Sequence, residues 1–248
     1  MSKLFNGKLN LLSGNMLKII AALTMVIDHV GYLLFPEIVV LRIIGRLSFP
    51  IFAFMIVEGC KYTRNKLRYF LNVSLLAFLC QIVYFFFSGS KEMYSLVCFA
   101  LSIPIIYLLQ FIKKNILSTD VNIVKKIVSI VLFFLSIFSV YVVNKLVSID
   151  YGFWGCMLPV ITSLLTFENG VSNKLLAKLD NKYVKTLLLA IGILLLCIEG
   201  LSVQPFALLS IPLILLYSGK RGKYNMKYYF YAFYPLHFVI IYILSLIF

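Results

Sequence analysis

Charged residues are scarce in this chain of 248 residues, and acidic residues are the scarcest. Only 13% of the residues are charged and only 9 are acidic, whereas 62% are hydrophobic and the mean hydropathy is +1.00. Soluble domains carry about 25% charged and roughly 45–50% apolar residues, so this composition excludes a water-soluble fold. At about 20 residues per membrane-spanning helix, the chain has room for about nine spans and for no sizeable extramembrane domain. We therefore expect an all-α, polytopic membrane bundle that forms a single domain over residues 1–248.

Patterns typical of metal sites and disulfide frameworks are also missing. Four of the five cysteines lie inside apolar runs, and none are paired at metal-ligand spacing, so buried free thiols are expected. The two histidines stand far apart in the sequence and offer no ligand set, so we expect no metal. The chain has no repeat with a period of about 20–50 residues and no low-complexity tract.

Nine apolar stretches follow one another along the chain. They are residues 15–35, 38–60, 67–88, 94–112, 124–147, 152–167, 184–200, 201–218 and 228–248. The stretch 152–167 is short for a span, and 184–218 fits one hairpin as well as two spans. The first stretch is too long for a signal-peptide core and is followed by no small-residue cleavage site, which indicates a retained helix.

Basic residues cluster between these stretches, and their excess gives a net charge of +14. Such clusters are typical of the cytoplasmic loops of membrane proteins rather than of a nucleic-acid interface. With the N-terminus in the cytoplasm, 19 of the 23 Lys and Arg residues fall on the inner side. They lie within residues 3–18, 61–68, 113–126, 174–185 and 220–227. The sequence thus predicts nine transmembrane helices, a cytoplasmic segment 1–14, an outer C-terminus, and membrane lipids but no nucleic acid as partners.

Ionisable side chains also occur inside the predicted spans, where each costs about 2.5–3.5 kcal/mol on insertion scales and is usually functional. They are Asp28, His29, Arg42, Arg46, Glu58 and His237. His237 follows Tyr234 and Pro235 in the last span. It is either a second catalytic group or a polar tie between helices.

Lys18 and His29 are expected on one face of the first helix. They are 11 residues apart, which is about three turns and a rise of about 16 Å. Ala22 and Met25 lie on the same stripe. An apolar stripe between two polar ends suits a thin ligand with a charged head, such as an acyl-CoA. The alternative is that Lys18 snorkels to the interface and His29 is a hydrogen-bonded interior residue.

Asp28 needs a cationic partner, because its sequence neighbour His29 points about 100° away on a helix. A hairpin through Pro36 brings Arg42 and Arg46 back beside it. We predict an Asp28–arginine ion pair that locks the hairpin, with the other arginine free to stabilise an oxyanion. Alternatively, both arginines only pair with Asp28, with Glu37 or with lipid headgroups.

Three further expectations concern the ends of the spans. Glu58 lies near the inner surface with Lys61 at i+3, which favours a local ion pair, the alternative being a part in a CoA entrance. Pro50 is expected to kink the second span. Asp150, Glu199 and Gln204 are placed at the outer side, where they either line an acceptor site or reflect ordinary loop polarity.

These residues also carry a resemblance to a known family. Matching segments are Lys18–Ala21, Ile27–Gly31, Leu41–Phe54, Val57–Gly59, Asp150–Gly155 and Phe230–His237. Together they closely resemble the TraX family, named for the conjugation protein that acetylates the N-terminus of F-pilin. The family is similar to multi-spanning membrane acyltransferases, in which a basic residue and a histidine separated by ten residues mark the acyl-transfer site. Lys18 and His29 match that spacing.

The resemblance implies a bacterial cell-membrane enzyme that transfers an acyl group, with acetyl-CoA as donor and no metal. The acceptor would be the amine of a pilin-like peptide or a hydroxyl of a glycan or lipid. His29 would act as general base or acyl acceptor, helped by Asp28, Arg42 and Arg46. Lys18, with Glu58 and Lys61, would hold CoA, while His237, Tyr234 and Asp150 would serve the substrate. One departure is residues 91–96, where the family usually has an Asn followed by Thr-Leu.

Two other classes of function use the same residues. A transporter or flippase of a small anionic solute would use them as a relay, although no inverted repeat is visible. A non-catalytic assembly factor would use the charged hairpin as a docking site.

Overall fold

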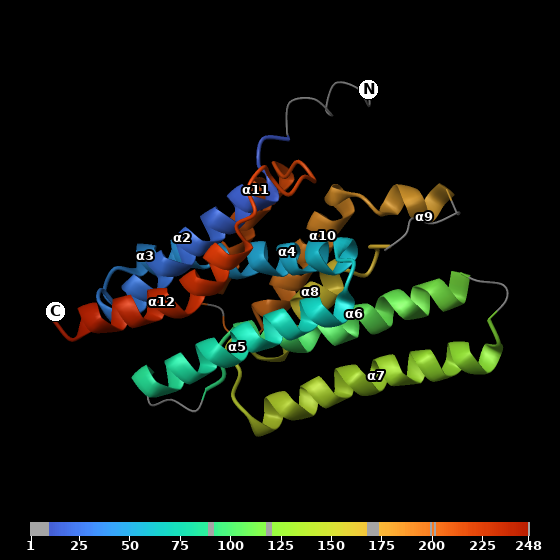
Figure 1. Ribbon diagram of the computed structural model, residues 1–248, viewed down its shortest axis with the longest axis horizontal. Helices are drawn as coiled ribbons and strands as arrows, with labels where there is room; N and C mark the ends of the chain where they lie inside the picture. The colour runs from blue at the N-terminus through green and yellow to red at the C-terminus, as the bar shows by residue number, and fades with distance from the viewer. Residues whose placement is uncertain are drawn as a thin grey trace.

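The computed structural model describes residues 10–88, 92–117, 121–167, 174–198, 200 and 202–247, and within these it is helical with no named strand (Figure 1). The helices are α2 (Gly14–Leu33), α3 (Val39–Gly45), α4 (Ser48–Tyr62), α5 (Lys66–Ser88), α6 (Leu96–Leu117), α7 (Ile123–Leu146), α8 (Gly152–Thr162), α9 (Lys174–Leu179), α10 (Lys182–Leu196), the 3-10 helix η1 (Gln204–Leu209), α11 (Ser210–Leu215) and α12 (Lys227–Ser245). The predicted all-α class is confirmed.

Six helices in the described part of the chain are long and apolar enough to cross a membrane. They are Gly14–Leu33, Val39–Tyr62, Lys66–Phe87, Leu96–Leu117, Ile123–Leu146 and Lys227–Ser245. The other three predicted spans form shorter helices: α8 has 11 residues, α10 has 15, and η1 with α11 covers Gln204–Leu215. At 1.5 Å per residue, α8 is about 16 Å long, which is roughly half of a 30 Å hydrocarbon core.

The second span is broken where Pro50 was expected to disturb it. Its two helices, α3 and α4, are separated by a turn at Arg46 and Leu47. Proline has no N–H to donate to the carbonyl of residue i−4, and its ring clashes with that carbonyl. For Pro50 that residue is Arg46. The break therefore falls at Arg46 itself, and it sets this arginine at the joint between two helices.

Three of the five basic segments meet at one end of the bundle, which we call the basic end. Leu12 bridges to Tyr217, the Gly14 N–H donates to the Lys220 carbonyl at 2.8 Å, and Lys182 Nζ donates to the Tyr217 carbonyl at 3.1 Å. At the opposite end, Met93 bridges to Ile149. Of the shorter helices, α8 packs against α10 and α6.

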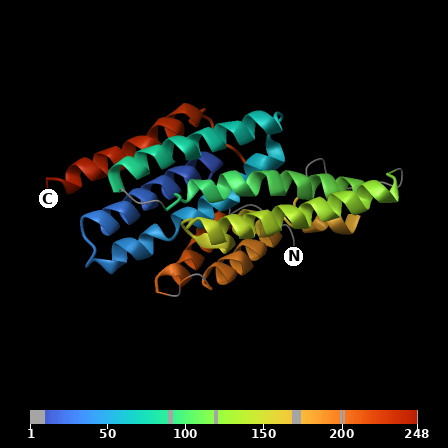
Figure 2. The same cartoon turned by 90° about the horizontal axis from the view of Figure 1, so that it is seen from below.

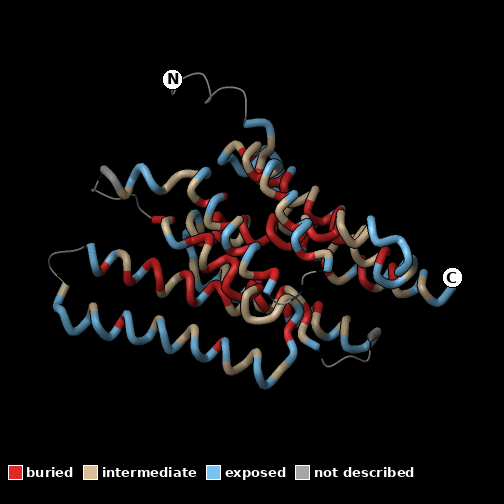
Figure 3. Tube along the Cα trace, turned by 180° about the vertical axis from the view of Figure 1, so that it is seen from behind, coloured by how far each residue is buried: buried red, intermediate tan, exposed pale blue. Residues whose placement is uncertain are grey.

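Burial divides the helices into an inner and an outer set. Along α8, seven of the 11 residues are buried. In contrast, α7 has only two buried residues and lies alongside α6 at the margin of the bundle (Figures 2 and 3). Its large apolar side chains, such as Phe134 and Phe138, are more than half exposed. An apolar helix with this much exposure is suited to contact with lipid tails.

Candidate active site

Asp28, Arg42 and Arg46 form an ion cluster between α2 and the broken second span. Arg46 Nη2 donates to both carboxylate oxygens of Asp28 at 2.8 Å, and Arg42 Nη1 lies 2.9 Å from Oδ2 of the same carboxylate. Arg42 also donates to the Asp28 backbone carbonyl at 3.2 Å. The predicted Asp28–arginine pair is therefore present, but the expectation that one arginine stays free of Asp28 is wrong. One carboxylate has enough acceptor positions for both guanidinium groups, and the cluster keeps one net positive charge.

Two glycines allow this close approach of the helices. A Cβ at Gly45 would overlap the Asp28 side chain, and a Cβ at Gly31 would overlap the Leu41 side chain. The short hairpin from α2 to α3 therefore depends on the absence of side chains at both positions. These glycines lie within the segments that carry the family resemblance, and packing is the physical reason for them.

The two arginines face different surroundings. The Arg42 side chain is 26% exposed and lies 5.0 Å from the centre of the Tyr32 ring. Arg46 is buried, and its guanidinium lies 5.5 Å from the centre of the Tyr151 ring. Arg46 Nη1 also donates to Gln204 Oε1 at 3.4 Å, whereas its Nε is buried with no partner among the described residues. Arg46 is therefore the better placed of the two to meet a substrate.

His29 and His237, which are 208 positions apart, meet next to this cluster. Their ring centroids are 5.2 Å apart, and Phe238 lies 4.5 Å from His29. His237 Nδ1 is 3.1 Å from the Phe233 carbonyl, which only accepts, so Nδ1 carries the proton of the neutral ring. His237 Nε2 and His29 Nδ1 are both buried without a partner in the part of the chain that the structure describes. The sequence left the role of His237 open, and the structure joins it to His29.

A small cavity of about 40 Å³ connects the predicted residues. It is lined by Met25, Asp28, His29, Gly45, Ser48, Phe49, Phe52, Tyr94, Ser95, Leu96, Phe99, Asp150, Tyr151 and Tyr234. It thus brings together four of the predicted residues, although they come from α2, α12 and the segment before α8. A cavity of this size holds a small group only, on the scale of one or a few water molecules.

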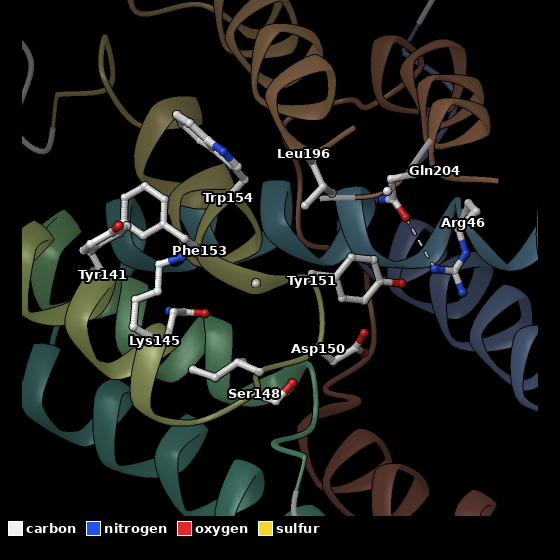
Figure 4. Close-up of a pocket in the computed structure, with 14 residues that line it drawn as sticks. Arg46, Tyr141, Lys145, Ser148, Asp150, Tyr151, Phe153, Trp154, Leu196 and Gln204 are labelled. Carbon is white, nitrogen blue, oxygen red and sulfur yellow. Dashed lines mark hydrogen bonds between the residues drawn. The ribbon is translucent and has the colours of Figure 1, made fainter. Parts of the chain in front are cut away.

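A large cavity of about 650 Å³ lies next to the small cavity, and Asp150 and Tyr151 line both. Its lining comes from helix ends at the end of the bundle opposite the basic end (Figure 4). Asp150 opens onto this cavity but is enclosed by protein on its other sides. The loss of bulk water raises the pKa of Asp150 to about 6, and the nearby Arg46 guanidinium opposes that shift.

Tyr151 lines both cavities together with Asp150, and we call these two residues the partition. The Tyr151 backbone is in the left-handed region, with φ of 64°, and its ring stacks on Phe49 at 3.9 Å with an interplanar angle of 5°. A left-handed backbone at a tyrosine is uncommon and strained, and it persists only where the surroundings hold it. This residue was quoted in the resemblance but was not predicted as a site residue.

The predicted CoA-binding residues lie at the basic end. The Lys18 side chain forms no hydrogen bond or ion pair with another described residue. Ala22 and Met25, on the same stripe as predicted, are only 4% and 7% exposed. The stripe therefore lies on the expected face of α2, but other helices cover that face.

Glu58 and Lys61 do not pair with each other, so the predicted local ion pair is wrong. Lys185 Nζ is 2.8 Å from Glu58 Oε1, and both side chains are less than 8% exposed. Lys61 Nζ is 2.8 Å from Asp180 Oδ2. Because Glu58 is buried, it requires a cation that is buried with it, and α10 supplies one. Glu58 and Lys61 are thus each paired with an oppositely charged side chain of the protein.

Some residues of the site were missed or lie outside the described part. Tyr94 lines the small cavity, with its ring centroid 6.1 Å from that of His29. The only sequence signal for it was the departure at residues 91–96. Gln204, for which a role at an acceptor site was left open, lines the large cavity. Glu199 and Lys91 lie outside the described residues.

Comparison with known proteins gives three findings. Residues 13–245 match the sequence profile of the family described as TraX protein. A probable fimbrial assembly protein, FimC of serogroup H1, from Dichelobacter nodosus is 26% identical over 250 residues, which cover 91% of this chain and 92% of that protein. An uncharacterized protein of Rickettsia prowazekii, RP591, is 32% identical over 104 residues, which cover 34% of this chain and 42% of that protein. No solved structure matches significantly.

Proposed function

This chain belongs to the TraX family, and we propose that it is a membrane-embedded acyltransferase that moves an acetyl group from acetyl-CoA to an amine or hydroxyl acceptor. The observation that carries the proposal is the meeting of the two histidines beside an ion cluster with one net positive charge. A base and a fixed positive charge at one place are what acyl transfer to a neutral nucleophile needs.

The histidines and the ion cluster have separate roles in the proposed reaction. The acceptor nitrogen or oxygen attacks the thioester carbonyl, its proton passes to His29, and the carbon–sulfur bond breaks when the tetrahedral intermediate collapses. The released thiolate takes the proton back from His29. Arg46, held by the hydrogen bonds from its Nη2 to both carboxylate oxygens of Asp28, stabilises the negative charge on the carbonyl oxygen. A second route has His29 accept the acetyl group first and pass it to the acceptor.

His237 supports His29 in this proposal. Its Nδ1–H is committed to the Phe233 carbonyl, so the lone pair of the neutral ring lies on Nε2. That nitrogen is buried and has no partner among the described residues. We propose that it accepts a hydrogen bond from the imidazolium of His29 when that imidazolium forms, which would fix the orientation of the His29 ring.

The acyl donor is a substrate whose charged part fits the basic end. The Asn15 N–H donates to the Arg221 carbonyl at 2.9 Å, so the basic segment 220–223 lies against the start of α2. Lys18 is on that same part of α2, and we propose that it holds CoA phosphates there. Because Ala22 and Met25 are covered, the acyl arm reaches His29 only if packed side chains beside α2 move.

The proposed orientation places the basic end in the cytoplasm of a bacterium and the large cavity on the outer side of the cell membrane. The gathering of three of the five basic segments at one end supports it. We further propose nine crossings, in which α8, α10 and η1 with α11 cross as short segments supported by the longer helices. Such segments are compatible with a bilayer where protein, rather than lipid, surrounds them.

Radiolabelled acetyl-CoA tests the function directly. The purified full chain in detergent or vesicles should release labelled product or carry label itself, and His29→Ala should abolish this while it still inserts and folds. Ser139→Ala, on the exposed face of α7, is a matched control that should keep full activity. Equal activity in His29→Ala and wild type would refute the assignment of His29.

A non-catalytic role in fimbrial assembly is the second candidate, and it is favoured by the name of the Dichelobacter relative. It predicts that His29→Ala still supports assembly and that the purified protein neither hydrolyses acetyl-CoA nor becomes labelled. A transporter would likewise leave acetyl-CoA unchanged.

A further inference from the structure

The large cavity is much bigger than the small cavity, and the chemistry proposed so far does not use most of its lining. Its volume of about 650 Å³ lies inside the range of roughly 300–1,000 Å³ that is usual for small-molecule sites. It starts at the end of the bundle opposite the basic end and reaches Arg46 and Tyr151. A ligand bound here would therefore lie directly behind the partition that separates it from the small cavity.

Aromatic rings form one side of this cavity. Figure 4 shows Tyr141, Phe153 and Trp154 together, across the cavity from Arg46 and Gln204. The ring centroids of Tyr141 and Phe153 are 5.7 Å apart, and those of Phe153 and Trp154 are 5.3 Å apart, both edge to face. An edge-to-face group leaves some ring faces directed away from its own members. Such faces can pack on the C–H surface of a flat, partly apolar ligand.

Hydrogen-bond donors and acceptors both belong to the same lining. Lys145, Ser148 and Asp150 line the cavity and are exposed. The Lys145 ammonium group only donates, the Asp150 carboxylate only accepts, and the Ser148 hydroxyl group does both. A ligand that meets all three side chains must offer both donors and acceptors, as hydroxyl groups do.

The charges of the lining oppose a strongly ionic ligand. Lys145 and Asp150 carry opposite signs, and Arg46 is already paired with Asp28. A polyphosphate would need an excess of cations. A peptide N-terminus would have Asp150 as its one unshared acid, and it would leave the aromatic side unexplained.

We propose that the large cavity binds a saccharide and directs one of its hydroxyl groups past Tyr151 towards His29. The binding part stands on the cavity alone, whereas the transfer part rests on the proposed function. In the transfer, the sugar oxygen forms the new ester bond to the acetyl carbon, the carbon–sulfur bond breaks, and the hydroxyl proton leaves with the thiol.

Trp154 makes the binding measurable, because it is the one tryptophan in the chain and it lines the cavity. The full chain in detergent is titrated with maltotriose, with an N-acetylglucosamine trisaccharide, and with a short peptide that has a free N-terminus, while tryptophan emission is recorded. Equilibrium dialysis with the same radiolabelled probes gives a second, independent readout. At least one saccharide is expected to bind saturably and to change the emission.

Two matched tyrosine variants test whether the saccharide binds in the large cavity. Tyr141→Ala removes one aromatic face and should weaken saccharide binding by about tenfold, which is the effect of about 1.4 kcal/mol. Tyr183→Ala is the control, because Tyr183 is similarly exposed, at 47% against 44%, but lies on α10 near the basic end. Equal losses in both variants would contradict the assignment of the cavity.

The outcomes separate this inference from the proposed function. If a saccharide binds at the cavity but no acetyl group is transferred, the cavity assignment stands and the acyltransferase proposal fails. If acetyl transfer to another acceptor occurs while neither readout detects saccharide binding, the saccharide inference is overturned. Saturable binding of the peptide alone would also overturn it and would identify an amine acceptor.

Discussion

Replacement of Asp28 by asparagine is expected to destabilise the protein severely. The substitution keeps the shape of the side chain but removes the negative charge that balances Arg42 and Arg46. The Arg46 side chain is 9% exposed and loses two contacts of 2.8 Å to charged oxygens. Removing one partner of a buried ion pair costs about 3–5 kcal/mol, because the other charge stays buried and uncompensated. Arg42 adds less, since its side chain is 26% exposed.

The expected order of stability follows from those exposures. Asp28→Asn should lose the most, Arg46→Gln should lose less, and Arg42→Gln should lose about 1 kcal/mol or less. The assay is reversible denaturation of the purified protein in detergent, with helix content followed by circular dichroism and each variant measured at the same detergent concentration. A loss for Asp28→Asn no larger than that for Arg42→Gln would refute the reasoning.

A double variant separates stability from chemistry. Asp28→Leu with Arg46→Met replaces the pair with apolar side chains, and such replacements of buried ion pairs are often neutral or stabilising. We expect this variant to recover most of the stability that Asp28→Asn loses, and to transfer no acetyl group because the fixed positive charge at Arg46 is gone. Recovery of activity along with stability would show that the cluster only locks the hairpin.

Three further predictions concern the other polar groups. His237→Asn should lower the single-turnover rate of acetyl transfer by about 10²-fold, and combining it with His29→Ala should cause no further loss, since the two act as a unit. Glu58→Gln should cost about 3 kcal/mol in the same denaturation assay, because Lys185 then keeps only a contact of 3.6 Å to Asp180. The loss of bulk water around Asp150 raises its pKa to about 6, so its carboxylate, the better hydrogen-bond acceptor, prevails above that pH. Saccharide affinity in the tryptophan titration should therefore rise as the pH increases through about 6, and Asp150→Asn should remove this dependence.

The parts that could be predicted from the sequence are those in which the partners are near in the chain. The Asp28–arginine contact followed from a short hairpin and from two arginines one turn apart. Helical periodicity predicted that Ala22 and Met25 lie on the same face of α2 as Lys18, and the burial of both residues agrees with this prediction. Each of these inferences needed only the geometry of one helix or one hairpin.

Contacts across the bundle could not be read in this way. Glu58 found its partner 127 residues away on α10, although a lysine at i+3 satisfied the local rule. The two histidines meet because α12 packs on α2, and nothing in their own segments indicates which helices are neighbours. An ion pair between exposed residues three or four positions apart on a helix stabilises it by at most a few tenths of a kcal/mol. A buried charge that lacks a partner costs several kcal/mol, so the tertiary partner decides.

The short helices connect the fold to the proposed chemistry. Nine full-length spans would fill the bundle from one end to the other, but the sequence predicted a short span at residues 152–167 and left 184–218 as one hairpin or two spans. In the structure, α7 continues to Leu146 while α10 ends at Leu196 and the 3-10 helix begins at Gln204, so the end opposite the basic end is left incompletely filled. The large cavity occupies that space, and its lining residues come from those ends. Because α8 begins beside Tyr151, the space left by the short helices reaches the partition, which also lines the small cavity with His29, and the proposed acceptor would have to arrive there.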